Sequence, residues 1–331
     1  MTAIPLPQDI EAVVTLALKE DVGDGDLTAQ LLPEDSTAQG QVITRDAAVF
    51  CGKAWFNEVF SQLSDAIKIT WEVEDGDDLV PNQVLCRFEG PARALVTGER
   101  TALNFLQTLS GTATTANRFA KRIKGTRATV RDTRKTLPGL RTAQKYAVAC
   151  GGCANHRMGL YDAILIKENH IMAAGSITAA VQQAQLVAGE KTQRTGLPVP
   201  IEVEVENIEE MEEAILAGAE LVLVDNFSIP LLNKAAAANK KHRSLNRSQA
   251  MVEASGGITW ENARSIADNG GDYIAVGTLT KDLQSVDLSM RFNVDGADSQ
   301  EPSARVADGT ATSGNSMESV AELIRSKNVK R

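Results

Sequence analysis

The stretch that decides the fold is Ile201-Glu202-Val203-Glu204-Val205-Glu206, in which apolar and acidic residues alternate without a break. In a strand, this alternation places the glutamates on one face and the β-branched residues on the other. On an isolated sheet the acidic face would simply face solvent. In an α/β barrel the outer face packs on helices, so the β-branched residues point outward. The pattern therefore predicts a barrel strand whose glutamates face the interior.

Short apolar runs on either side of this stretch predict further strands. They alternate with helical segments and lie at residues 128–132, 163–167, 221–225, 251–254 and 273–276. Six strands separated by helices imply a parallel sheet. Reactive residues such as Lys167 and Asp225 follow the ends of several runs, which is typical of a barrel. A doubly wound sheet would instead have one switch point after a Gly-x-Gly-x-x-Gly turn, and that motif is absent.

A smaller α/β domain is expected before the barrel. Its predicted strands lie at residues 41–47, 67–74, 84–89 and 92–97, and its predicted helices at 8–20 and 54–63. A linking helix at 99–123 ends near a glycine. We predict a small domain over residues 1–115 that is completed by about 280–293, and a barrel over 116–279. Because six strands are fewer than eight, the barrel is expected to be open and incomplete.

Residues 294–331 are predicted to form a flexible C-terminal extension. Residues 295–316 are rich in Gly, Ser, Ala, Thr and Asp and contain almost no large apolar side chains. A short terminal helix at 317–326 is the alternative for the last part. We expect this extension to be dispensable.

Charge and composition exclude several classes of protein. The net charge of −9 argues against binding to duplex DNA or anionic membranes, and the 4% aromatic content argues weakly against single-stranded nucleic acid. The N-terminus lacks the basic and apolar regions of a signal peptide, and no run of about 18 apolar residues predicts a membrane span. We expect a cytoplasmic protein that binds neither nucleic acid nor membrane.

Two local patterns resemble metal or redox sites. Residues 21–26 form an acidic cluster like a calcium loop, but the closing glutamate of an EF-hand is missing. Cys150 and Cys153 form a Cys-x-x-Cys within an apolar periodic stretch, with no second cysteine pair at zinc-site spacing. Buried helix packing is therefore favoured for these cysteines.

Positive charge is concentrated between residues 131 and 157. This segment contains one acid, Asp132, and seven basic residues: Arg131, Arg134, Lys135, Arg141, Lys145, His156 and Arg157. A solvated helix face would account for Arg141 and Lys145. It fits Arg134-Lys135 poorly, because that pair lies in the loop after a predicted strand. Since arginine binds carboxylate or phosphate through two hydrogen bonds, the segment predicts a site for several anions.

The interior acids need a cation, and glycine loops offer a place for phosphate. Unpaired carboxylates inside a barrel would be costly, so the glutamates must meet a metal ion or Lys135 and Lys167. Asp225 adds a carboxylate from the next strand, and an oxygen-only ligand set suits Mg²⁺. Ser255-Gly256-Gly257 and Gly277-Thr278 each follow a strand and precede a helix, as in phosphate cradles of barrels. These sites together would bind a ligand with a phosphate at one end, an anion chelated by a metal in the middle, and carboxylates beside it. That combination suggests phosphoribosyl transfer to a carboxylated acceptor.

The motifs as a set resemble the quinolinate phosphoribosyltransferase family over about residues 8–293. They are RDTRKTLPGLR at 131–141, KYAV at 145–148, GG at 151–152, HR at 156–157, KENH at 167–170, EVEVE at 202–206, LVDNF at 223–227 and SGGI at 255–258. The resemblance implies a small α/β sandwich domain plus an open, incomplete barrel of the type II phosphoribosyltransferase kind. It also implies a homodimer whose active sites are shared between subunits.

The resemblance further implies an activity. This activity converts quinolinate and 5-phosphoribosyl-1-pyrophosphate (PRPP) to nicotinate mononucleotide, pyrophosphate and carbon dioxide, in the de novo synthesis of NAD. The enzyme would be a pentosyltransferase that uses Mg²⁺.

Residue roles follow from the motif positions. The positions that bind the quinolinate carboxylates are Arg134, His156, Arg157 and Lys167, with Arg100 contributed by the neighbouring subunit. The catalytic positions are Lys135, Glu204 and Asp225, of which Glu204 and Asp225 also hold Mg²⁺ through water. The positions that bind PRPP are Lys135, Asn169, His170, Ser255, Gly256, Gly257 and Gly277. Glu204 is chosen over Glu202 and Glu206 by its spacing from Asp225.

Three alternatives differ from this interpretation. A related enzyme acting on nicotinate would need fewer cationic groups, because its acceptor has one carboxylate. A barrel aldolase would use Lys167 as a Schiff-base nucleophile. A simple anion receptor would not place Glu204 and Asp225 beside its ligand.

Overall fold

The six predicted parallel strands form one sheet, with the order β6-β11-β10-β9-β8-β7. The computed structural model describes residues 4–245 and 250–294. The strands are β6 (Thr129–Arg131), β7 (Ile164–Ile166), β8 (Ile201–Val205), β9 (Leu221–Asp225), β10 (Met251–Ser255) and β11 (Tyr273–Ala275). The first strand of the set, β6, lies beside the last, β11, as in a barrel. The sheet does not close, however, and β6 and β7 form its two edges. A bridge between Arg131 and Ala154 occupies part of the gap, so the barrel is open and incomplete as predicted.

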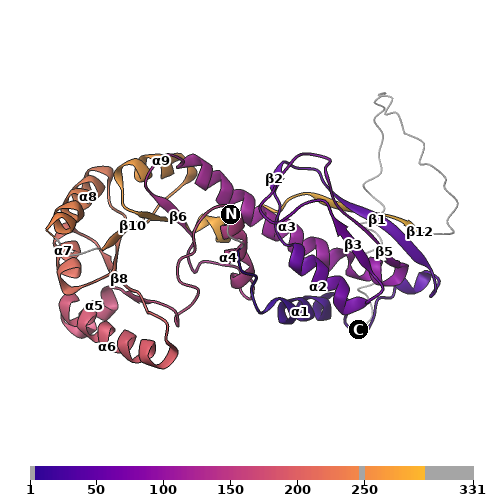
Figure 1. Ribbon diagram of the computed structural model, residues 1–331, viewed down its shortest axis with the longest axis horizontal. Coiled ribbons are helices and arrows are strands. Elements are labelled where there is room, and N and C mark those ends of the chain that lie inside the picture. The colour runs from indigo at the N-terminus through magenta and orange to yellow at the C-terminus, as the bar shows by residue number, and fades with distance from the viewer. Residues whose placement is uncertain (1–3, 246–249, 295–331) are drawn as a thin grey trace, which may run out of the picture. The chain divides into compact units, whose positions relative to one another are not determined.

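Helices cover the outer face of this sheet (Figure 1). They are α5 (Glu168–Ala174), α6 (Ile177–Thr195), α7 (Ile208–Ala217), α8 (Ile229–Ser244) and α9 (Trp260–Asn269). Two further helices, α4 (Arg141–Cys150) and α10 (Thr278–Lys281), pack on the long helix at residues 92–122. Ile201, Val203 and Val205 are buried in the core of the barrel, as the alternating pattern predicts. Glu202 and Glu204 lie on the opposite face of β8. Glu206 lies beyond the strand end and is exposed, so the prediction that three glutamates face inward is wrong for this residue.

The smaller domain is built on a four-stranded antiparallel sheet with the order β12-β1-β5-β3. These strands are β1 (Thr37–Thr44), β3 (Lys68–Trp71), β5 (Val84–Pro91) and β12 (Leu288–Val294), and a two-stranded sheet joins β2 (Ala48–Val49) to β4 (Asp78–Leu79). The helices α1 (Ile10–Val22), η1 (Ala29–Leu31) and α2 (Lys53–Leu63) accompany them. The strand β12 follows the barrel in the chain and pairs with β1 from Ala38 to Thr44.

The predicted strand at residues 92–97 is wrong, because this segment begins the 31-residue helix α3 (Ala92–Arg122). Pro91 precedes the first turn, and the buried residues Ala92, Leu95, Gly98 and Ala102 recur at helical spacing. A Cβ atom on Gly98 would lie 2.7 Å from side-chain atoms of Leu63 and Phe60. Close packing of α2 on α3 therefore decides the structure of a segment whose local sequence was interpreted as a strand.

The helix α3 contributes to two hydrophobic cores. Leu95 and Leu103 lie in the core of the sandwich, and Ala116 and Phe119 lie in the core of the barrel. Among the described residues, no helix is both long enough and apolar enough to cross a membrane. The domain boundaries proposed from sequence stay predictions. The extension was predicted over residues 294–331, and this is wrong for Val294, which pairs with Ala38 at the end of β12. The rest of the extension, with its alternative helix at 317–326, lies outside the described residues.

Candidate active site

Two arginines and their unused donors mark a site for anions at the open side of the barrel. Arg134 lies in the segment after β6, and Arg157 lies between α4 and β7. Burial lowers the pKa of Arg157, the positive charge of Arg134 lowers it further, and Glu202 and Asp162 oppose this change. The Nη1 of Arg157 donates to the Ala163 carbonyl at 3.1 Å, while the buried Nε atoms of Arg134 and Arg157 have no hydrogen-bond partner in the part of the chain that the structure describes. Like charges held together with free donors are suited to carboxylates.

His156 contacts a pair of buried acids next to this site. Its Nε2 lies 2.6 Å from an oxygen of Glu202, which is on β8. Glu253 on β10 accepts a hydrogen bond of 2.8 Å from Arg131, whose guanidinium lies 3.7 Å from the centre of the Tyr273 ring. Burial, followed by the negative charge of Glu202, raises the pKa of Glu253 to about 7. The interior of the barrel thus holds ionisable groups of both signs in contact.

Lys145 and Arg141 support the loops of the site, and the alternative of a solvated helix face is wrong for them. Lys145 is fully buried and forms an ion pair with Asp132, and it donates to the His156 carbonyl at 2.9 Å. Asp132 also accepts from the backbone N–H of His156 at 2.9 Å. Arg141 donates to the carbonyls of Met158 and Arg134. These contacts stabilise the segments that carry the anion-binding groups.

Lys167 follows β7 and forms an ion pair with Glu204 of β8. The backbone N–H of Lys167 donates to Nδ1 of His170 at 3.0 Å, which fixes the start of α5. Asn169 and His170 are exposed in the first turn of that helix. The acid that the sequence pattern directed inward therefore meets Lys167, one of the two cations expected for it.

The ends of β9 and β10 form a narrow turn that requires glycine. Asp225 is paired in register with Ser255, and the backbone N–H of Asn226 donates to the Ser255 carbonyl at 2.9 Å. Gly256 has a φ of +90°, and a Cβ atom there would overlap the Asn226 side chain. Gly257 also has a positive φ, of +55°. The chain therefore presents backbone N–H groups close to Asp225, as a phosphate cradle requires.

Lys135 reaches the second glycine loop. A Cβ atom on Gly277 would lie 3.3 Å from Cδ of Lys135, so the lysine side chain passes directly over this glycine. Thr280 of α10 donates to the Lys135 carbonyl at 2.8 Å. Lys135 and Gly277, predicted to bind the same ligand, are therefore neighbours.

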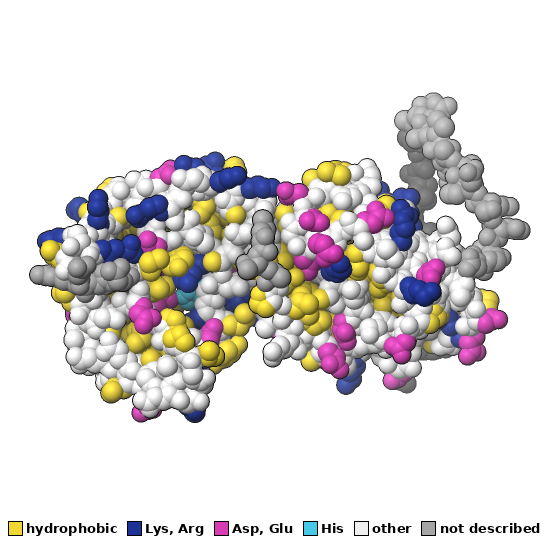
Figure 2. All heavy atoms as spheres, in the orientation of Figure 1, with side chains coloured by type: hydrophobic (Ala, Val, Ile, Leu, Met, Phe, Trp, Pro, Cys, Tyr) yellow, Lys and Arg dark blue, Asp and Glu magenta, His cyan; other side chains and the backbone are white. Residues whose placement is uncertain are grey.

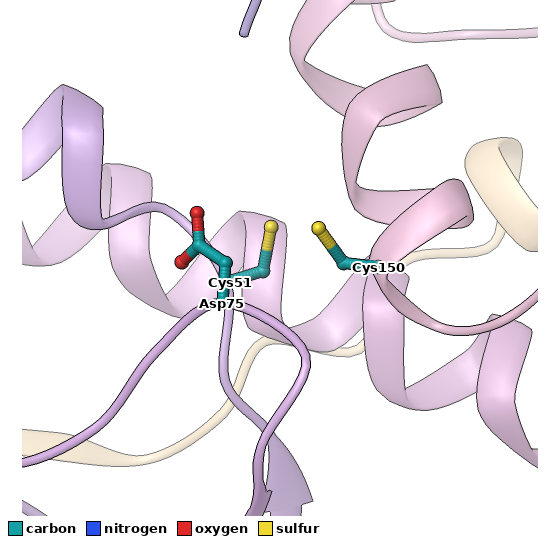
Figure 3. A group of neighbouring side chains, drawn as sticks. All are labelled: Cys51, Asp75 and Cys150. Carbon is teal, nitrogen blue, oxygen red and sulfur yellow. The ribbon is translucent and has the colours of Figure 1, made fainter. Parts of the chain in front are cut away.

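Two groups of side chains among the described residues could bind a metal ion by spacing alone. In the first, the ligand atoms of His156, Glu202 and Glu253 lie within 4.8 Å of one another, but Arg131 already pairs with Glu253. The second group contains Cys51, Asp75 and Cys150, and Figure 3 shows the two sulfur atoms directed toward each other.

The second group is explained by packing. Asp75 accepts hydrogen bonds from the backbone of Gly52 at 2.9 Å and Lys53 at 3.2 Å, and from the Tyr146 hydroxyl at 2.8 Å. Burial raises the pKa of the Cys51 thiol well above its ordinary value. In the predicted Cys-x-x-Cys, Cys153 donates to the Ala116 carbonyl at 3.2 Å, so packing also accounts for this cysteine.

Comparison with known proteins identifies the family. A model described as the N-terminal domain of quinolinate phosphoribosyl transferase matches residues 26–110, and one described as the C-terminal domain matches residues 112–291. The chain belongs to the quinolinate phosphoribosyl transferase family. It is 40% identical over 271 residues to a probable nicotinate-nucleotide pyrophosphorylase (carboxylating) of Bacillus subtilis, covering 82% of this chain and 89% of the relative.

Two further relatives agree with this assignment. A nicotinate-nucleotide pyrophosphorylase (carboxylating) of Mycobacterium leprae is 38% identical, with 83% of this chain and 94% of the relative covered. The structure of the nicotinate-nucleotide pyrophosphorylase of Francisella tularensis has a TM-score of 0.79 and 40% identity, covering 88% of this chain and 98% of that one. The family and the fold class predicted from sequence are therefore confirmed.

The structure brings most of the predicted site residues of this quinolinate phosphoribosyl transferase family member to the ends of the barrel strands. His156 contacts Glu202, Arg157 lies close enough to both Arg134 and Glu202 for their charges to affect it, and Lys167 contacts Glu204. Arg100 is different, because it is exposed on α3 beside Glu99. The individual roles in substrate binding stay predictions.

Sequence reasoning assigned no substrate-binding or catalytic role to several residues that shape this site. They are Arg131, Asp132, Lys145, Glu202 and Glu253. A local signal existed for Glu253 and Arg131, since each lies on the inward face of a predicted strand near its end. None existed for Lys145, because its burial depends on Asp132 from a different element.

Proposed function

We propose that this protein is a quinolinate phosphoribosyltransferase that releases carbon dioxide. The observation that carries the proposal is the set of cations Arg134, His156, Arg157 and Lys167 beside the acids Glu204 and Asp225. The cations suit the two carboxylates of quinolinate. The acids suit the positive charge that develops on ribose during transfer.

The cationic side chains hold the acceptor for attack. Arg134 and Arg157 offer free donors to the carboxylates, which orients the pyridine nitrogen toward the anomeric carbon of PRPP. A C–N bond forms at that carbon while the bond to pyrophosphate breaks. The bond to the 2-carboxylate then breaks, carbon dioxide leaves, and its electron pair moves into the pyridinium ring, where C2 takes up a proton. Tighter binding of the 3-carboxylate leaves the departing group loosely held.

The loops after β9, β10 and β11 receive PRPP. Ser255, Gly256, Gly257 and Gly277 contribute a phosphate cradle, and Lys135 adds a positive charge beside Gly277. Asn169 and His170, at the start of α5, are proposed to contact the same substrate. Glu204 and Asp225 lie on the same face of adjacent strands and stabilise the ribose cation as the leaving group departs.

Mg²⁺ fits the acids at this edge of the sheet. Glu204 and Asp225 offer carboxylate oxygens as ligands and no sulfur. Such a set suits Mg²⁺ that is bound largely through water and substrate phosphates. When bound, the ion would neutralise charge on the pyrophosphate group. Glu204 forms its ion pair with Lys167 on the side of quinolinate, so it lies between the two substrate sites.

A homodimer in the cytoplasm is the proposed state of the enzyme. Arg100 is exposed and is the one predicted quinolinate ligand that lies on the small domain, which supports its use by a neighbouring subunit. Cys51, Cys86, Cys150 and Cys153 are free thiols, and this is usual in a reducing compartment.

The decisive experiment is incubation with PRPP, Mg²⁺ and quinolinate, followed by detection of carbon dioxide and nicotinate mononucleotide. We expect both products from quinolinate and little turnover of nicotinate in a parallel reaction. Product from nicotinate alone would contradict the proposal. Borohydride trapping at Lys167 in the presence of a carbonyl substrate would instead support an aldolase.

Arg134→Ala tests the carboxylate site directly. We expect quinolinate turnover to be lost while PRPP binding, measured by calorimetry, stays close to that of the parent. Arg118→Ala, an exposed arginine on α3, is the matched control. Unchanged quinolinate affinity in Arg134→Ala would remove Arg134 from the site.

A further inference from the structure

His156 is held at both its backbone and its ring. Asp132 accepts from its backbone N–H at 2.9 Å, and Lys145 donates to its carbonyl at 2.9 Å. The ring is fixed separately, since Nε2 lies 2.6 Å from Glu202. About 12% of the His156 side chain remains exposed. Nδ1 is therefore the ring nitrogen left to meet a ligand.

Glu202 is an unusual partner because it is a buried carboxylate with little else to hold it. Its side chain is 5% exposed, and its Oε1 has no hydrogen-bond partner among the described residues. A buried carboxylate without full hydrogen bonding destabilises a fold. Such a group in the interior of a barrel requires an explanation beyond packing.

Glu253 and Arg131 supply the opposite side of this arrangement. Glu253 is completely buried, lies within 4.8 Å of both Glu202 and His156, and is paired with Arg131 at 2.8 Å. The Arg131 guanidinium is itself fixed against the Tyr273 ring. Because Arg131 holds Glu253 in place, the Glu253 carboxyl group occupies the space next to Glu202 and limits the positions that Glu202 can take. Glu253 and Arg131 therefore help to keep Glu202 in contact with His156.

We propose that Glu202, supported by Glu253 and Arg131, is a positioning residue that directs a protonated Nδ1 of His156 to donate to a carboxylate of the acceptor. This inference rests on the proposed function, in which His156 binds quinolinate. Glu202 itself does not touch the substrate and acts only through the ring of His156. It thus differs from Glu204, which is proposed to face the ribose.

The test is a double-mutant cycle on substrate affinity. Glu202→Gln keeps the shape of the side chain but removes its charge, and we expect the Kd for quinolinate to rise about tenfold. The Kd for PRPP with Mg²⁺ should stay within twofold of the parent. In a His156→Ala background, Glu202→Gln should cause no further loss of quinolinate affinity, because its effect passes through the ring.

A control and a second measurement keep the result decisive. Glu190→Gln, on the exposed surface of α6, should leave both affinities unchanged. Should Glu202→Gln fail to fold, ¹⁵N NMR of the parent still tests the contact. The chain has only three histidines, and we expect the His156 Nε2 to carry a proton. An Nε2 without a proton would overturn the inference.

The outcomes separate this inference from the proposed function. A parent that neither binds nor converts quinolinate would overturn both. A parent that binds quinolinate, loses affinity on His156→Ala and keeps it on Glu202→Gln would overturn the positioning role alone. Additive losses in the double variant would show that Glu202 acts independently of His156, which also contradicts the proposal.

Discussion

Glu253 illustrates at the residue scale how the barrel interior tolerates several charged groups. It is completely buried and lies close to a second carboxylate, and both conditions favour its neutral form. Arg131 and His156 oppose them, yet the pKa still rises to about 7. Folding and protonation of this residue are therefore linked.

The stability of the protein should fall as pH rises from about 4.5 to 7 because of Glu253. Below its ordinary value of 4.5 the carboxyl group is protonated in both folded and unfolded chains, and its contribution is fully present. Above this value the unfolded chain loses the proton first, so the contribution disappears as pH approaches 7. Replacing Glu253 by glutamine, which cannot ionise, should remove this loss, a difference of about 3 kcal/mol across the range.

Chemical denaturation of parent and Glu253→Gln at pH 5, 6 and 7 measures this difference. The free energy of unfolding of the variant should improve relative to the parent at each step. Glu190→Gln provides the same chemical change on the surface of α6. A constant difference between Glu253→Gln and parent at all three pH values would argue that Glu253 is not protonated in the folded protein.

The turn after β10 shows at the element scale why two adjacent strand ends must be considered together. Gly256 has a backbone conformation that favours glycine, and the space above it is occupied by Asn226 from the end of β9. Asn226 has a φ of 54°, which is uncommon for a residue other than glycine. The conformation of Asn226 after β9 therefore depends on the absence of a side chain at Gly256 after β10.

Gly256→Ala should weaken PRPP binding by at least tenfold. The added methyl group overlaps Asn226 and would displace Asp225 from its place beside the phosphate cradle. The Kd for PRPP with Mg²⁺ is the measurement. Gly125→Ala is the matched control, because Gly125 has a similar φ of +88° but open space around it. Equal PRPP affinities in the two variants would mean that the contact between residue 256 and Asn226 does not affect PRPP binding.

The path of the chain matters at the scale of the whole molecule. The strand β12 returns after the barrel to pair with β1, and α3 contributes side chains to both hydrophobic cores. Arg100 lies on the part of α3 that belongs to the small domain. A site completed by Arg100 of a second subunit would explain why this arginine is exposed.

Subunit complementation should reveal a shared site. Arg100→Ala and Lys135→Ala chains should each be inactive. A mixed dimer would carry both defects in one site and neither in the other. Equal mixing therefore should restore about a quarter of the parent activity, because half of the dimers are mixed and half of their sites are intact. Mass spectrometry should first verify that the subunits have exchanged. If activity then fails to recover, the result would contradict the shared site.

Local patterns were sufficient to predict the six parallel strands, the inward face of Glu202 and Glu204 on β8, and the concentration of basic side chains at residues 131–157. Hydrophobic periodicity can be recognised from residues that are close in the sequence. The alternation at residues 201–205 therefore predicts which side chains pack against the helices. The family was also predictable, since its motifs are continuous in the chain.

Packing between distant segments decided the rest. The segment at residues 92–97 was predicted to be a strand, yet it is helical, and Gly98 allows α2 to approach α3 there. Lys145 resembles a surface lysine until Asp132 is placed beside it, and Glu202 becomes a partner of His156 only when β8 closes on the segment after α4. A charge can be buried only where its counter-charge arrives from another part of the chain, and no local pattern contains that information.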